Sequence, residues 1–122
     1  MKDKRKMVEY EGVKMFLHRA VHQRMLFHYA IAEVMGHKDF SAYFNFIVFP
    51  RVSEERPYSD NKDGWKMDCV IKKAFKKVLS GFEKSVSIMG DRNFQQQLKP
   101  YRQDVKDKVS IMATLGPSVW ER

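Results

Sequence analysis

The chain has 122 residues, of which 43% are hydrophobic, and a formal net charge of +8. This length suits one ordinary domain, and the apolar share excludes a chain that is disordered by composition. The single cysteine, Cys69, excludes the class of small secreted proteins that are stapled by disulfides. We therefore expect one domain over residues 1–122, in the cytoplasm or another reducing compartment.

The basic N-terminal residues lack the apolar segment that would make them a signal peptide, because Glu9, Glu11 and Lys14 interrupt the pattern. No apolar run approaches the ~18 residues that are needed to cross a bilayer. We expect no membrane span, and we interpret residues 1–7 as a flexible basic arm.

Apolar residues recur at helical spacing over residues 13–35, and Gly36 offers a stop at the C-terminal end. The pattern predicts one long helix over this range. Acidic and basic residues balance one another across residues 8–36, so this helix does not account for the excess of positive charge.

Five aromatic rings lie close together between residues 39 and 50. The segment is either a short helix capped by Asp39 or a buried strand near residues 43–49. We favour the helix, because a lone strand would leave unpaired backbone groups and no other segment offers it a convincing partner. The rings exceed what one face of a short helix can bury, so some of them should reach the surface and contact another chain. These candidate partner-binding residues are Phe40, Tyr43, Phe44, Phe46 and Phe49.

Residues 51–64 are predicted to form a loop, since they contain Pro57 and end in Asp-Gly. Over residues 65–88 the apolar side chains follow the i, i+3, i+4, i+7 pattern more clearly than anywhere else, which predicts one amphipathic helix. The opposite face carries six lysines against Asp68 and Glu83, a net charge of 6 − 2 = +4. These lysines are Lys66, Lys72, Lys73, Lys76, Lys77 and Lys84.

A last helix is predicted to begin near Asp91, its expected N-cap, and Pro100 either kinks it or begins a second piece. Residues 116–117, Gly-Pro, end it and leave residues 117–122 as a tail. Together the segments predict an all-α protein, a small bundle of three to four helices. The alternative has one short strand or extended aromatic segment near residues 43–49, paired by another chain in an oligomer.

The row of lysines is the leading candidate for a functional surface, because like charges on one helical face repel one another and form no stabilising ion pairs. A phosphate backbone would compensate for that cost through counterion release. We therefore predict a nucleic-acid-binding accessory protein, for RNA or DNA, whose six lysines contact phosphates. Arg5, Lys6 and Arg102 are expected to extend the patch. Lysine lacks the planar fork that recognises guanine, so we expect recognition of backbone or shape rather than of sequence.

Two other interpretations of the basic face stay open. The protein is alternatively an interaction or inhibitory module that docks on an acidic surface of a partner, with the aromatic residues 40–49 as its anchor. A homo-oligomer built through the same residues is compatible with either function. In the plainest interpretation the lysines are the solvated outer face of a bundle helix.

The chain carries no motif that indicates a metal site, a cofactor or a catalytic centre. His18 and His22 are i, i+4 neighbours, but no third ligand is evident on their face, and no glutamate follows His18 in the metalloprotease pattern. Residues 59–64 resemble the start of a calcium loop, but its twelfth position would be Val70. Without a nucleophile motif, a phosphate-binding glycine loop or a dinucleotide fingerprint, we expect no cofactor, no metal and no enzymatic activity.

Overall fold

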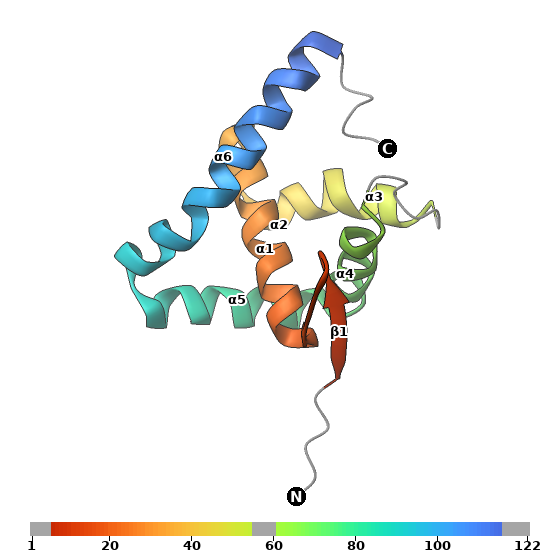
Figure 1. Cartoon of the computed structure of the whole chain (residues 1–122), viewed down its shortest axis with the longest axis vertical. Coiled ribbons are helices and arrows are strands. Elements are labelled where there is room, and N and C mark those ends of the chain that lie inside the picture. The colour runs from red at the N-terminus through yellow and green to blue at the C-terminus, as the bar shows by residue number, and fades with distance from the viewer. Residues whose placement is uncertain (1–5, 55–60, 116–122) are drawn as a thin grey trace, which may run out of the picture.

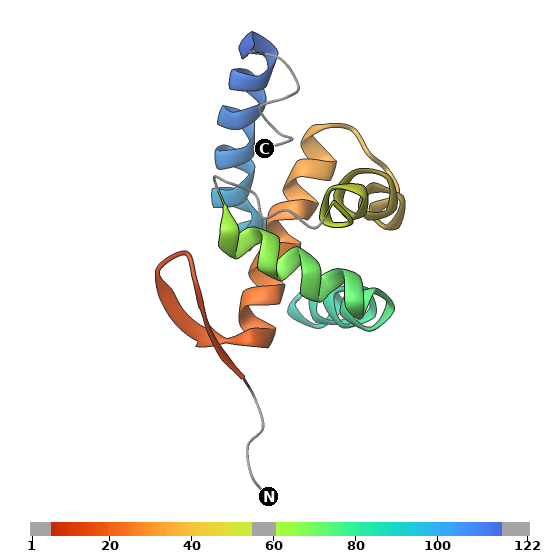
Figure 2. The ribbon, with the colours of Figure 1, turned by 90° about the vertical axis from the view of Figure 1, so that its right-hand side faces the viewer.

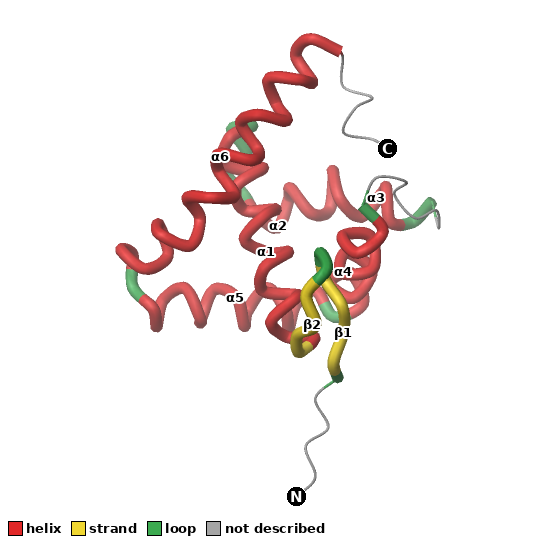
Figure 3. The backbone as a smooth tube through the Cα atoms, viewed as in Figure 1, coloured by secondary structure: helices red, strands yellow, loops and turns green. Residues whose placement is uncertain are grey.

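The computed structural model describes residues 6–54 and 61–115, and the side chains of these residues up to residue 107. The chain is mostly helical (78%) with a short two-stranded antiparallel sheet, which confirms the predicted helical bundle (Figures 1 and 3). The elements in chain order are β1 (Met7–Tyr10), β2 (Val13–Phe16), α1 (Leu17–Val34), α2 (Phe40–Tyr43), a π-helical turn η1 (Phe44–Val48), α3 (Phe49–Val52), α4 (Lys62–Lys73), α5 (Phe75–Met89) and α6 (Asp91–Leu115).

Helix α1 lies at the centre of the bundle. It packs along α6, crosses α4, and also contacts the hairpin, α2 and α5 (Figures 1 and 2). Its interior residues include Ala20, Met25 and Ala30, which are fully buried. The small alanine side chains allow neighbouring helices to approach α1 closely. One continuous cluster of buried apolar residues joins the elements around it.

The first described element is a β-hairpin, whose second strand lies where the sequence pattern predicts the first turn of a long helix. β1 pairs antiparallel with β2, and Tyr10 lies opposite Val13. In β1 the more buried side chains, Val8 and Tyr10, alternate with the exposed Met7 and Glu9, as in a sheet with one face turned inward, and Met15 is the buried residue of β2. The predicted helix over residues 13–35 is therefore wrong at its start, because α1 begins at Leu17.

The hairpin turn consists of two residues with left-handed backbone, Glu11 at φ 53° and Gly12 at φ 82°. Two successive left-handed residues form the tight turn whose twist matches that of paired strands. The backbone N–H of Glu11 donates to Asp63 Oδ2 on α4 at 3.0 Å. This contact from a distant helix holds a conformation that glutamate by itself disfavours.

Gly36 ends α1, as predicted. At φ 82°, Gly36 reverses the chain after the last helical residue, Val34. The His37 N–H donates to the Ala32 carbonyl at 2.8 Å, and the Gly36 N–H donates to the Glu33 carbonyl at 3.2 Å. This pair of hydrogen bonds is the Schellman motif, which satisfies carbonyls that the helix end would otherwise leave unpaired.

The aromatic segment is helical over residues 40–52, which confirms the favoured interpretation, and the alternative of a strand near residues 43–49 is wrong. Asp39 caps the segment as expected, since its carboxylate accepts the Ala42 N–H at 3.1 Å. The backbone groups are therefore satisfied locally, and no partner strand is needed.

A single π-helical turn interrupts this segment and decides which rings face inward. The Phe49 N–H donates to the carbonyl of Phe44, five residues earlier, so the turn holds one residue more than an α-helical turn. Phe44 and Phe49 consequently both point into the core, at 0% and 9% exposure. Phe46, within the same turn, projects outward at 77% exposure, with Ile47 beside it at 41%.

The predicted helix over residues 65–88 is two helices, because the chain breaks at Ala74 (φ −132°, ψ 41°). Alanine is the best helix former, so local propensity gives no reason for a break there. The reason is tertiary. The break lets Phe75 pack on Phe44 and Phe49, at ring-centroid distances of 5.2 and 4.9 Å. Farther along α5, Phe82 meets Phe94 of α6 at 6.2 Å.

The predicted loop over residues 51–64 is shorter at both ends than the sequence indicates. α3 continues to Val52, and α4 begins at Lys62, where the Asn61 side chain accepts the Gly64 N–H at 2.9 Å. Residues 55–60 lie outside the described residues.

The ends of the chain differ from expectation in two described places. Met7, predicted to belong to the basic arm, is the first residue of β1. Asp91 is the first helical residue of α6 rather than its cap, and Pro100 lies inside that helix without dividing it. Residues 1–5 and the predicted tail over 117–122 lie outside the described residues.

Candidate nucleic-acid interface

The six predicted lysines all lie on the surface, but on two helices rather than one. α4 and α5 run in different directions: α5 crosses the view in Figure 1 and is seen end-on in Figure 2, where α4 crosses the view. We call the six residues the α4–α5 lysine surface. Lys66, Lys72 and Lys73 are exposed on α4, and Lys76, Lys77 and Lys84 are exposed on α5.

The break at Ala74 brings charge to one corner of the molecule. Two lysines precede it and two follow within three residues, so four ammonium groups flank the change of direction. These four are Lys72, Lys73, Lys76 and Lys77. Lys72 donates a hydrogen bond from Nζ to Ser53 Oγ at 2.5 Å, which fixes the lysine side chain beside the end of α3.

Of the two acidic residues that accompany these lysines in the sequence, only one lies on the surface. Asp68 is 1% exposed and its carboxylate is paired inside the protein. Glu83 on α5 is exposed. Between residues 66 and 84 the exposed charged groups are therefore six ammonium groups and one carboxylate. Their net charge is 6 − 1 = +5, whereas all charged residues of the segment together give +4.

The residues predicted to extend the patch are not gathered at this corner. Arg102 lies on α6, where its Nε and Nη2 donate to the two carboxylate oxygens of Glu33 at 2.6 and 2.9 Å. This ion pair balances its charge. Lys6 is exposed beside β1, and its carbonyl accepts the Leu17 N–H at 2.7 Å. Arg5 lies outside the described residues.

The predicted aromatic anchor is mostly core. Tyr43, Phe44 and Phe49 are at most 9% exposed, and Phe40 is half-buried against Phe44 at 4.9 Å between ring centroids. Tyr43, Phe44 and Phe49 therefore contribute to the core, and a role of the five residues in binding a partner stays a prediction. Phe46 alone of the five has an exposed ring.

A buried polar cluster that the sequence analysis missed joins α1, α2 and α4. The Arg24 guanidinium donates to both carboxylate oxygens of Asp68, from Nε at 2.9 Å and from Nη2 at 3.0 Å. His28 Nε2 lies 2.7 Å from Asp68 Oδ1, and its Nδ1 lies 2.8 Å from the Tyr43 hydroxyl. All four side chains are buried, with exposures from 1% to 4%. The buried polar cluster is thus Arg24, His28, Tyr43 and Asp68.

The charges of the cluster cancel when Asp68 is ionised and His28 is neutral. Burial opposes ionisation of Asp68, but the adjacent His28 and Arg24 outweigh it and hold its pKa well below the ordinary range. Burial lowers the pKa of His28, and the attraction of Asp68 offsets this only in part. A carboxylate can only accept, so the neutral ring donates from Nε2 to Asp68 and accepts from the Tyr43 hydroxyl at Nδ1.

The order carboxylate, imidazole, hydroxyl is the one that activates a nucleophile in hydrolytic enzymes. Here the hydroxyl belongs to Tyr43, which is 2% exposed, so no substrate reaches it. We interpret the cluster as a structural connection. Its signal in the sequence was the position of Arg24 and His28, one helical turn apart, among apolar residues of the same helix.

Stability is expected to fall on acidification, first as the pH drops from about 7 to 5. The pKa of His28 is 6.5 in an ordinary environment and lower in the fold, so the unfolded chain binds this proton first. A second loss is expected below about pH 4, where folded Asp68 stays ionised while an ordinary aspartate takes up a proton. Urea unfolding at a series of pH values measures both steps.

The variant His28→Gln keeps an N–H donor for Asp68 but removes the titrating ring, so the first step should disappear and the second persist. His18→Gln is the matched control, because His18 is exposed and stacks on Phe16 at 5.8 Å between centroids. The assignment of the first loss of stability to His28 is contradicted if that loss persists in His28→Gln but disappears in His18→Gln.

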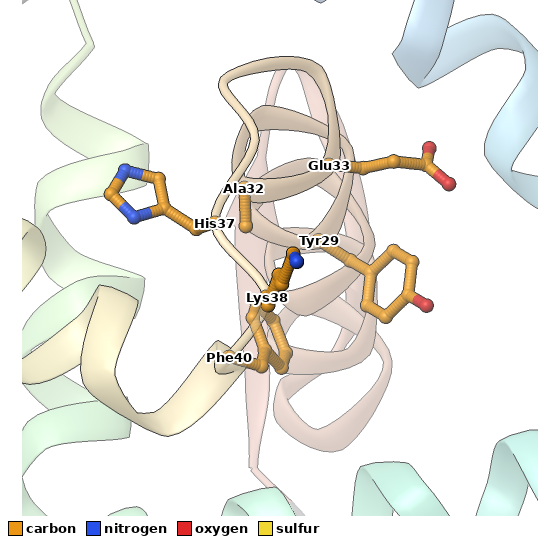
Figure 4. A pocket seen from close by; sticks show the side chains of 6 residues that line it. All are labelled: Tyr29, Ala32, Glu33, His37, Lys38 and Phe40. Carbon is orange, nitrogen blue, oxygen red and sulfur yellow. The ribbon is translucent and has the colours of Figure 1, made fainter.

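A small pocket of about 110 Å³ lies at the C-terminal end of α1 (Figure 4). It is well below the ~300 Å³ at which small-molecule sites begin. The His37 ring and the Glu33 carboxylate point to opposite sides of it, so they do not converge on one reacting atom. Glu33 is also held by Arg102. The pocket lining is Tyr29, Ala32, Glu33, His37, Lys38 and Phe40.

The described part of the chain holds no group of three residues arranged to bind a metal ion. His22, one of the two histidines considered for such a site, lies 3.2 Å from Gln97 Oε1 through its Nε2 and packs on Phe82 at 5.5 Å between ring centroids. Over residues 6–54 and 61–115, none of the helices combines the length and the apolar character required to span a bilayer.

No protein-family model matches this chain, and neither a curated protein nor a solved structure shows significant similarity to it. Function is therefore inferred from the charge, burial and geometry of the molecule.

Proposed function

We propose that this protein is a nucleic-acid-binding accessory protein and that the α4–α5 lysine surface contacts the phosphate backbone. The observation that carries the proposal is the separation of charge across α4. Asp68 turns inward and pairs with Arg24, while the lysines of the same helix remain exposed. Burial of Asp68 thus takes one negative charge away from the surface of α4 and leaves that surface strongly positive.

A polyanion is the partner that best compensates for this arrangement. Four lysines around the Ala74 corner repel one another in the free protein. Phosphates placed among them would relieve that repulsion and release counterions. Ammonium groups are point charges without bidentate geometry, so the expected recognition is of the backbone and its shape rather than of base edges.

Replacing three corner lysines should weaken nucleic-acid binding and its salt dependence. In the variant Lys73→Gln/Lys76→Gln/Lys77→Gln, the slope of log affinity against log salt is expected to become shallower by about 2 to 3, since each phosphate contact contributes about 0.7 to 0.9. All three side chains are exposed, so the fold should be unaffected. Fluorescence anisotropy with labelled RNA and DNA across a salt series measures the slope.

The matched control removes three exposed lysines from other elements, in the variant Lys38→Gln/Lys99→Gln/Lys106→Gln. It changes the net charge by the same amount, so it should lower affinity much less than the corner variant. Equal losses in the two variants would show that only net charge matters. An absence of binding by the unaltered protein at low salt would refute the proposed function.

A protein with an acidic surface is the second candidate partner, because its carboxylates would pair with the lysines while the exposed Phe46 and Ile47 add apolar contact. That candidate predicts capture of a protein by the unaltered chain and only weak, salt-sensitive binding to nucleic acid. Capture that is lost both in Phe46→Ala and in the corner variant would support it over the nucleic-acid proposal.

A further inference from the structure

Ser80 is an exposed serine on α5, the helix that carries three of the six residues of the α4–α5 lysine surface and lies at an edge of the bundle (Figure 1). In an α-helix, side chains three and four residues apart are neighbours, about 5–6 Å apart between Cβ atoms. The three lysines of α5 stand at these spacings from Ser80, and each of them is exposed. They are Lys76 and Lys77 in the preceding turn and Lys84 in the following turn.

A hydroxyl group cannot balance the charge of these lysines, whereas a phosphate on the same oxygen would. Phosphoserine carries about −1.5 to −2 charges near pH 7 and three acceptor oxygens. Its pairing with Lys84 has the favourable orientation on a helix, because the negative group lies four residues before the positive one. Glu83 is the one acidic residue of α5 within a turn of Ser80, and the three lysines outnumber it.

The neighbours of Ser80 also suit its recognition by a protein kinase. Kinases discriminate among substrates by the pattern of charges, and Lys76 and Lys77 match a kinase whose acidic groove holds basic residues before the acceptor. Gly81 follows the acceptor directly, and an added Cβ there would meet nothing within 4 Å, so open space adjoins the hydroxyl. Glycine is also a poor helix former, so the helix opens more easily at this point than elsewhere.

We propose that Ser80 is a phosphorylation site for a basic-directed serine kinase, and that its phosphate pairs with the three neighbouring lysines and withdraws them from nucleic acid. The serine oxygen attacks the γ-phosphorus of a nucleoside triphosphate, the bond from that phosphorus to the bridging oxygen breaks, and the nucleoside diphosphate leaves. The hydroxyl proton passes to a carboxylate of the kinase. The control of binding rests on the proposed function, whereas the modification itself does not.

The modification is tested with the unaltered protein, ATP and a purified serine kinase that selects basic residues before its acceptor. Mass spectrometry of the digested protein should find phosphate on Ser80. In Lys76→Gln/Lys77→Gln the rate of phosphorylation at Ser80 should fall by about tenfold or more. Lys84→Gln is the matched control, since this lysine follows the acceptor, and it should leave the rate unchanged. No phosphate on Ser80, or equal rates in the two variants, overturns the proposed site.

The effect on binding is tested by incorporating phosphoserine during synthesis at position 80 or, as the matched control, at position 87. Ser87 is exposed on the same helix, but Glu83 and Lys84 precede it by four and three residues, so their charges cancel. Phosphate at position 80 should weaken binding to labelled RNA and DNA by at least about tenfold near 0.1 M salt and make the log–log salt slope shallower by about 2 to 3. At position 87 the loss should stay below about threefold. Equal losses overturn the control of binding through the three lysines.

Phosphorus NMR measures the pairing without any nucleic acid. The second pKa of phosphoserine is ordinarily about 6, and neighbouring ammonium groups lower it because they favour the dianion. The phosphate at position 80 should therefore titrate at lower pH than the phosphate at position 87, and Lys76→Gln/Lys84→Gln should remove the difference. Equal titrations overturn the pairing, and circular dichroism confirms that each form is folded. A lower titration at position 80 in a protein that binds neither RNA nor DNA refutes the proposed function and its control, but supports the phosphate site.

Discussion

Replacing Asp68 by alanine is expected to lower the free energy of unfolding by about 3–5 kcal/mol, the largest effect of any single change considered for this protein. The reason is the buried guanidinium of Arg24, which is 4% exposed and loses both of its carboxylate acceptors. His28 loses the acceptor of its Nε2–H as well. An uncompensated charge in the core costs far more than the pair contributes.

Urea denaturation followed by circular dichroism measures this loss. Glu83→Ala is the matched control, since Glu83 is an exposed acidic residue on the neighbouring helix and its removal should change stability by less than about 0.5 kcal/mol. The double variant Arg24→Met/Asp68→Leu removes both charges together, so it should recover a large part of the stability. An Asp68→Ala protein as stable as the control would contradict this prediction.

Gly64→Ala is expected to destabilise the protein by about 2 kcal/mol, although alanine in a helix ordinarily gains about 1 kcal/mol over glycine. A Cβ atom at Gly64 would lie 2.6 Å from Arg24 Cζ. The guanidinium cannot move aside cheaply, because Asp68 holds it by two hydrogen bonds and the Phe27 ring lies 4.6 Å away. The clash therefore outweighs the gain in helix propensity.

Gly81→Ala is the matched control for this prediction, because Gly81 is also helical and nothing lies within 4 Å of the added Cβ. It should stabilise the protein by about 0.5–1 kcal/mol. In an Arg24→Met background the obstacle is gone, so Gly64→Ala should become neutral or stabilising. Thermal unfolding of the four-protein cycle measures the coupling between the two positions. If the stability changes caused by Gly64→Ala and Arg24→Met simply add in the double variant, the proposed contact between the two positions is contradicted.

The sequence alone determined which faces are polar, where one helix stops and where another begins. Helical spacing placed all six lysines opposite the apolar stripe, and the structure finds each of them exposed. Asp39 and Gly36 marked a helix start and a helix stop through chemistry confined to a few neighbouring residues. Such features depend on backbone geometry within one or two turns, so they can be read locally.

Only the tertiary structure decided where a helix breaks and which distant segments contact each other. Local propensity opposes a break at Ala74, which arises because Phe75 packs on rings some 30 residues away in the chain. The hairpin turn at Glu11 is held by Asp63, 52 residues distant. A four-residue strand gives too short a pattern to distinguish from a helical turn.

The same limit applies to the candidate interface. The sequence gives Asp68 and Glu83 equal weight as counter-charges to the lysines, and only the fold shows that Asp68 pairs with Arg24, 44 positions earlier, while Glu83 stays in water. Five neighbouring rings likewise look equivalent until the π-helical turn separates Phe46 from the core. Periodicity reports the side of an element on which a residue lies, whereas contacts between distant segments decide what that residue meets.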